Sequence, residues 1–101
     1  MSEHWEKYLK QLEEQWNRVI GVLPLGFSIR VEEAGGTSMI HVSVYYSGPN
    51  FREIVQPGGV KSSDSDTDAY VGSISFRAAL HEVRSFVLQV VTKTQQELSQ
   101  L

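Results

Sequence analysis

The residues of this sequence whose types and spacing could bind a metal ion are the aspartates of the stretch SSDSDTD. Asp64, Asp66 and Asp68 alternate like the first carboxylates of an EF-hand calcium loop. The sixth loop position, which needs glycine, is then Ala69, and the twelfth, which needs glutamate, is Ser75. We therefore predict no calcium loop, and we interpret the stretch as a solvated loop or as an acidic surface for a basic partner.

Histidine, a common metal ligand and general base, is not placed for either task. The chain has three histidines, which fall on three different predicted elements without zinc-ligand spacing: His4, His41 and His81. HEVRS begins at His81 like a zinc-protease motif but has Ser85 in place of the second histidine. No nucleophile elbow, P-loop or dinucleotide-binding glycine motif occurs. We predict that the protein is not an enzyme and has no catalytic residue, no metal and no cofactor.

The composition is that of one small folded domain. The 101 residues are 41% hydrophobic and include no cysteine, so one apolar core must hold the domain without disulfides. Nine basic against twelve acidic residues give a formal charge of -3, which argues against nucleic acid or an anionic membrane as partner. MSEHWEKYLK lacks the apolar core of a secretory signal, and no apolar run approaches the roughly 20 residues of a membrane span. We expect one cytoplasmic domain over residues 1–101.

Two segments show the apolar periodicity of an amphipathic helix. The first predicts a helix over 3–20, with a stripe formed by Trp5, Tyr8, Leu9, Leu12, Trp16, Val19 and Ile20. The second predicts a helix over 76–98, capped by Ser75, with a stripe formed by Phe76, Ala79, Leu80, Val83, Val87, Val90 and Val91. Phe86 and Leu88 widen the second stripe, so we predict that they contact the first helix or a second subunit of a homodimer.

Between the predicted helices, strict alternation of apolar and polar residues predicts a β-hairpin over 25–33 and 38–46. The glycine pair at 35–36 suits a two-residue turn. That turn would pair Val31 with Ile40, and the apolar side chains would then share one face: Leu25, Phe27, Ile29, Val31, Ile40, Val42, Val44 and Tyr46.

The chain between this hairpin and the last helix predicts two shorter strands. FREIVQ, at about 51–56, predicts an edge strand; an acidic loop over 57–68 and a strand over 69–75 follow. The predicted fold class is α+β, a single two-layer domain in the order α-β-β-β-(β)-α. We expect an antiparallel sheet with both helices on one face.

The sheet face away from the helices is predicted to carry polar and aromatic side chains. Arg30, His41 and Tyr45 fall on it, with Val71 as a further candidate. Such faces are commonly solvated, but arginine and tyrosine also dominate contact energies at protein interfaces. We predict a partner-binding surface made of Arg30, His41, Tyr45, Arg52, Ile54, Asp64, Asp66 and Asp68.

These features favour a non-catalytic interaction module that binds, sequesters or inhibits another macromolecule, such as an accessory, inhibitor or chaperone-like protein of bacterial or phage origin. We expect the partner to be a basic protein. The element order resembles that of the double-stranded RNA-binding domain, which implies nucleic-acid binding as an alternative. In place of that family's lysine cluster, SFRAALHEVR offers Arg77 and Arg84. A small-molecule or nucleotide-binding protein is a further alternative, and it needs a pocket.

Overall fold

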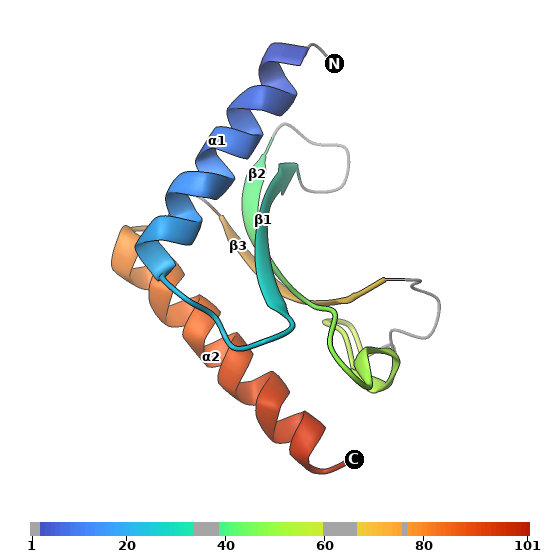
Figure 1. Cartoon of the computed structure of the whole chain (residues 1–101). Coiled ribbons are helices and arrows are strands. Elements are labelled where there is room, and N and C mark those ends of the chain that lie inside the picture. The colour runs from blue at the N-terminus through green and yellow to red at the C-terminus, as the bar shows by residue number, and fades with distance from the viewer. Residues whose placement is uncertain (1–2, 34–38, 60–66, 76) are drawn as a thin grey trace.

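The computed structural model describes residues 3–33, 39–59, 67–75 and 77–101 of the chain. The sheet is antiparallel, with the strand order β1-β2-β3. Both helices pack on the same face of this sheet, so the predicted α+β arrangement of two layers is confirmed (Figure 1). Neither helix, over the residues described, combines the length and the apolarity needed to cross a bilayer. The elements are α1 (Glu3–Ile20), β1 (Phe27–Glu33), β2 (Ile40–Tyr46), η1 (Phe51–Glu53), β3 (Ala69–Ser75) and α2 (Leu80–Ser99).

The hairpin pairing differs from the prediction by two residues. Val31 pairs with Val42 rather than with Ile40, and Ile29 pairs with Val44. Side chains of a strand alternate between two faces, so a shift of two residues keeps the same set on the core side. The connection at 34–38, which holds the predicted glycine turn, lies outside the described residues.

The core lies between the sheet and the helices. Its larger cluster takes one apolar face from each hairpin strand and a stripe from α2: Ile20, Ile29, Val31, Ile40, Val42, Val44, Val83, Val87 and Val91. Leu9, Leu12 and Trp16 of α1 are half-buried against this cluster. Each fully buried valine contributes ~1.5–3 kcal/mol. Leu25, predicted to begin the apolar face of the hairpin, precedes β1 and is 99% exposed.

The predicted edge strand at about 51–56 is wrong. Asn50 adopts a left-handed conformation with φ of 65°, and the chain then forms the short 3-10 helix η1. Asparagine tolerates this conformation better than most residues, so the turn redirects the chain before a strand can extend. Ile54 follows with only 1% of its surface exposed, and it forms a second small core cluster with Tyr46 and Ala69.

The last helix begins later and ends later than predicted. Ser75, the predicted N-cap, is the final residue of β3 and pairs with His41, while Ala79 occupies the N-cap position. At the other end α2 continues through Ser99, because Leu98 packs against the second core cluster. The polar C-terminal segment is therefore part of the folded structure.

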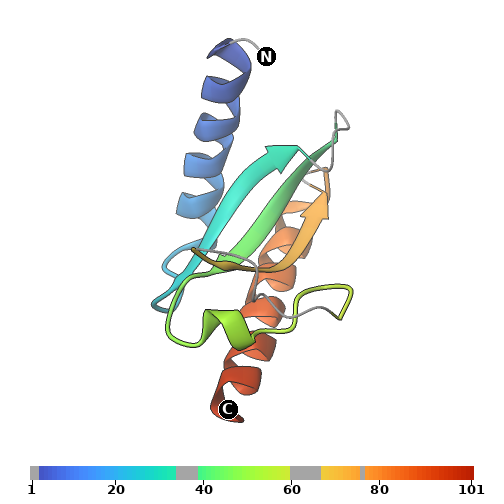
Figure 2. The same ribbon diagram turned by 90° about the vertical axis from the view of Figure 1, so that its right-hand side faces the viewer.

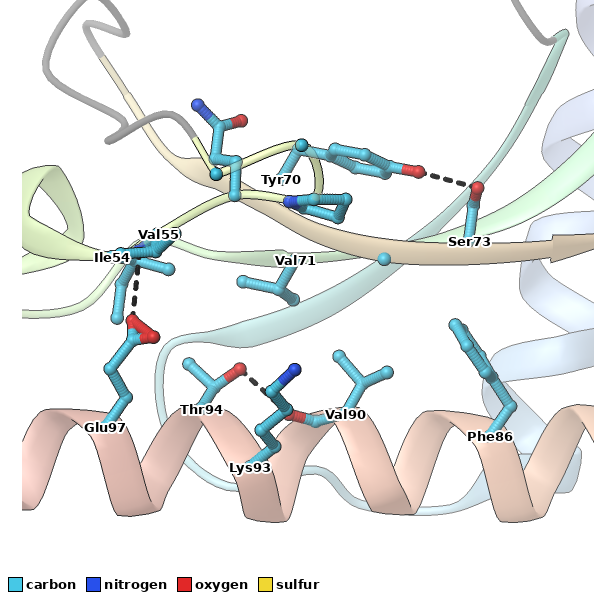
Figure 3. Close-up of a pocket in the computed structure, with 15 residues that line it drawn as sticks. Ile54, Val55, Tyr70, Val71, Ser73, Phe86, Val90, Lys93, Thr94 and Glu97 are labelled. Carbon is cyan, nitrogen blue, oxygen red and sulfur yellow. Dashed lines mark hydrogen bonds between the residues drawn. The ribbon is translucent and has the colours of Figure 1, made fainter.

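Strand β3 contains an irregularity that sends neighbouring side chains to different sides of the sheet. Val44 pairs with Gly72 while the adjacent Tyr45 pairs with Tyr70, so Val71 is an extra residue, as in a β-bulge. Val71 packs against both core clusters and points toward α2, not onto the open face where it was a candidate (Figure 3). Tyr70, in contrast, lies on the open face beside Tyr45.

Candidate functional site

Neither α1 nor α2 covers the other face of the sheet (Figure 2). Side chains from all three strands line a hollow on this face. The structure brings four of the predicted site residues together on this face: Arg30, His41, Tyr45 and Asp68. They come from β1, β2 and the segment that leads into β3. Strand pairing places them side by side although they are far apart in the chain.

Arg30 is held in place by two neighbours. Its guanidinium carbon lies 4.1 Å from the centre of the Tyr45 ring, and its Nη2 donates a hydrogen bond to Asp68 Oδ2 at 2.5 Å. Burial lowers the pKa of Arg30, but the charge and hydrogen bond of Asp68, together with the charges of Tyr45 and Glu32, raise it overall. A guanidinium fixed on both its face and its edge has little conformational freedom left to lose when a partner binds.

Tyr45 is fixed in turn by Glu32. The Tyr45 hydroxyl donates a hydrogen bond to Glu32 Oε1, and the Tyr45 ring lies 5.8 Å from the ring of Tyr70. Burial, followed by the hydrogen bond and charge of Glu32, raises the pKa of Tyr45 well above its ordinary value of 10.0. Tyr45 therefore stays a protonated hydrogen-bond donor throughout the physiological pH range.

Beside this pair the open face is hollowed. His41 Nδ1 lies 3.5 Å from Ser73 Oγ, which shares a hydrogen bond of 2.6 Å with the Tyr70 hydroxyl. His41 Nε2 is buried and has no hydrogen-bond partner among the residues described. The hollow, which we call the open-face hollow, measures about 470 Å³ and is lined by Glu32, Glu33, His41, Ser43, Tyr45, Tyr70 and Ser73.

The other predicted contact residues lie elsewhere. Arg52 is exposed on η1, 5.3 Å from the ring centre of Phe51, and not on a strand of the sheet. Ile54 is a core residue, so its prediction as an exposed contact is wrong. Asp64 and Asp66 lie outside the described residues.

The predicted dimer residues on α2 differ in their surroundings. Phe86 is half-buried within its own chain, packed against the core and next to Gly72. Leu88 is 49% exposed.

A larger cavity lies between β3, α2 and the segment 54–59, and sequence reasoning did not find it (Figure 3). We call it the β3–α2 cavity; its volume is about 770 Å³. Its apolar lining includes Val71, Phe86 and Val90. The only sequence signal was the apolar arc of the last helix widened by Phe86, which was interpreted as a contact with a second neighbour.

Three polar side chains that line the β3–α2 cavity come from the C-terminal half of α2: Lys93, Thr94 and Glu97. Glu97 Oε2 accepts a hydrogen bond from the backbone N–H of Val55 at 3.0 Å, which ties the segment 54–59 to the helix. The Thr94 hydroxyl donates to the Val90 carbonyl at 2.8 Å. Lys93 is exposed and forms no ion pair with any residue in the described ranges.

Within the part of the chain that the structure describes, no three His, Cys, Asp or Glu side chains are grouped to hold a metal ion. Comparison of the chain with protein-family models, with curated proteins and with solved structures finds no match.

Proposed function

We propose that this protein is a non-catalytic interaction module that binds a protein partner through the open face of its sheet. The observation that carries the proposal is the fixed pair of Arg30 and Tyr45, with the guanidinium stacked on the ring and tied to Asp68. Arginine and tyrosine are enriched among the residues that dominate binding energy. Anchors that are already ordered lose less entropy on association.

The charge of this surface indicates the kind of partner. Asp68 and Glu32 both act on the guanidinium of Arg30, and Glu33 lines the open-face hollow together with Glu32. Three described carboxylates therefore accompany one described guanidinium at this face. A surface with excess negative charge attracts a basic partner and repels the phosphates of nucleic acid. A protein surface with exposed lysine or arginine side chains is therefore the partner that this face supports best.

The test is an affinity capture from lysate of the source cells with the double variant Arg30→Ala and Tyr45→Ala, quantified by mass spectrometry against the unaltered protein. Both substitutions remove the fixed pair from the open face. The matched control, Arg18→Ala with Tyr8→Ala, removes the same two kinds of side chain at exposed positions of α1. Circular dichroism first verifies that all three proteins are folded.

The proposal expects one basic protein to be captured by the unaltered chain and by the control, and to be lost with the open-face variant. A protein captured equally by all three would place the contact elsewhere. Capture of nucleic acid that weakens steeply with salt would support the alternative of a nucleic-acid-binding domain.

Self-association is a separate part of the proposal. Leu80 and Leu88 are exposed on α2, two turns apart, so they fall on one face of the helix. Two copies could bury these leucines against each other. Light scattering of the unaltered chain should then give twice the mass of one chain, and Leu88→Glu should return it to that of a monomer.

A further inference from the structure

We propose that the β3–α2 cavity binds a small amphipathic anion, which lays an apolar body against Val71, Phe86 and Val90 and presents its negative group to Lys93. The site is distinct from the Arg30–Tyr45 pair of the proposed protein interface. It would give the chain a small-molecule ligand in addition to a partner.

The size and lining of the cavity are the first argument. Its volume of about 770 Å³ falls within the range of small-molecule sites, which are mostly apolar with a few fixed polar groups. Val71 descends from the strand and Phe86 and Val90 rise from the helix, so apolar groups face the space from two sides (Figure 3). A ligand with an apolar body would remove this surface from water.

The close approach of strand and helix shapes the apolar end. A Cβ atom at Gly72 would lie 3.1 Å from Phe86 Cζ and 3.3 Å from Val90 Cγ2. Glycine at this position therefore lets the Phe86 ring lie directly against the strand backbone. Phe86 and Val90 therefore form the apolar end of the cavity together with the strand backbone.

The second argument is charge. Glu97 is engaged with the Val55 N–H, and the Thr94 hydroxyl with the Val90 carbonyl, so both have structural partners. Lys93, from the same helix, points its ammonium group toward the space below Val71 (Figure 3). No described residue forms an ion pair with Lys93, so its ammonium group can pair with the negative group of a ligand in the cavity.

The experiment uses two dyes that differ in one group. Anilinonaphthalene sulfonate carries an apolar body and an anion, and phenylnaphthylamine has the same body without the sulfonate. Fluorescence titration compares the full chain with Lys93→Met and with Lys10→Met, an identical substitution at an exposed position of α1. Near-ultraviolet circular dichroism confirms that each variant keeps its tertiary packing, because a loosely packed state would also bind the dye.

We expect the sulfonate to bind the unaltered chain and Lys10→Met equally, and Lys93→Met about fivefold more weakly. Phenylnaphthylamine should bind all three proteins within about twofold of each other. Methyl resonances of Val71 and Val90 should shift with the sulfonate, whereas those of Val22, which is fully exposed, should not. The proposal is overturned by equal sulfonate affinity in the two lysine variants, by shifts confined to other methyl groups, or by no saturable binding up to ~1 mM.

Discussion

The carboxylate of Glu13 on α1 accepts a hydrogen bond from the backbone N–H of Val31, 3.2 Å away in β1. β1 is an outer strand of the sheet that the structure describes, so alternate backbone N–H groups point away from β2, and that of Val31 is one of them. An open strand edge can pair with another chain, and a carboxylate that occupies one of its donors makes that pairing less favourable. The helix therefore shields the edge as well as the core.

Replacing Glu13 should therefore destabilise the fold more than replacing its neighbour. Glu13→Ala leaves the Val31 N–H without its acceptor and should lower the free energy of unfolding by about 1 kcal/mol. Glu14→Ala, at an exposed position, should change it by less than ~0.5 kcal/mol. Urea titration measures both, and hydrogen exchange of the Val31 amide should accelerate only in Glu13→Ala. Equal exchange in the two variants would show that the bond does not persist in solution.

Ile54 and Val55 provide a matched pair of neighbours. Ile54 is 1% exposed and Val55 is 46% exposed. Ile54→Ala should lower the free energy of unfolding by ~2–4 kcal/mol, because it leaves a cavity in the second core cluster. Val55→Ala should cost about 1 kcal/mol or less. A small effect of Ile54→Ala in urea titration would mean that the segment after η1 is not packed as described.

Gly72 should be intolerant of a side chain because of Phe86. Gly72→Ala places a methyl group 3.1 Å from Phe86 Cζ and should lower the free energy of unfolding by about 1 kcal/mol. In a Phe86→Leu background the same substitution should cost less, since the ring is gone. A double-mutant cycle in urea measures this coupling. Strictly additive effects would exclude the close approach as the cause.

Tyr45 should make stability fall at alkaline pH. Burial and Glu32 raise its pKa in the folded state above the value of 10.0 that it has when unfolded. Above about pH 10 the unfolded chain therefore loses the proton of the Tyr45 hydroxyl, whereas the folded chain keeps it. The contribution of Tyr45 to the free energy of unfolding is complete below about pH 10 and declines above it. Urea midpoints from about pH 9 to about pH 11 should fall more steeply for the unaltered chain than for Tyr45→Phe. Parallel curves would contradict the raised pKa of Tyr45 in the folded state.

Features set by periodic patterns could be predicted from the sequence. The stripe of Val83, Val87 and Val91 and the alternation through Ile29 and Val31 repeat with the periods of a helix and a strand, and the structure buries these side chains. Periodicity determines the face of each residue but leaves the pairing of strands free in steps of two. The prediction accordingly placed the apolar side chains of the hairpin on the correct face, but it shifted the strand pairing by two residues.

Features set by a single residue were not predictable in this way. The left-handed Asn50 turned an expected strand into η1, and the extra residue Val71 in β3 moved a side chain from the open face to the β3–α2 cavity. The open-face residues Arg30, His41 and Tyr45 were found because they follow strand alternation. The β3–α2 cavity was not predicted, because its walls come from segments that meet only in the folded chain.

The hydrogen-bonded pair of Tyr70 and Ser73 lines both the open-face hollow and the β3–α2 cavity. The two sites therefore share a wall at the outer strand of the sheet. The Tyr70 ring lies 5.8 Å from the ring of Tyr45, so a ligand in the cavity that displaced Tyr70 would change the surroundings of Tyr45 on the open face. Thermodynamic linkage then requires the effect to be reciprocal, so that the partner changes the affinity for the ligand by the same factor. Tyr70 would then couple the two proposed sites, and the domain would respond to the ligand and to the partner together.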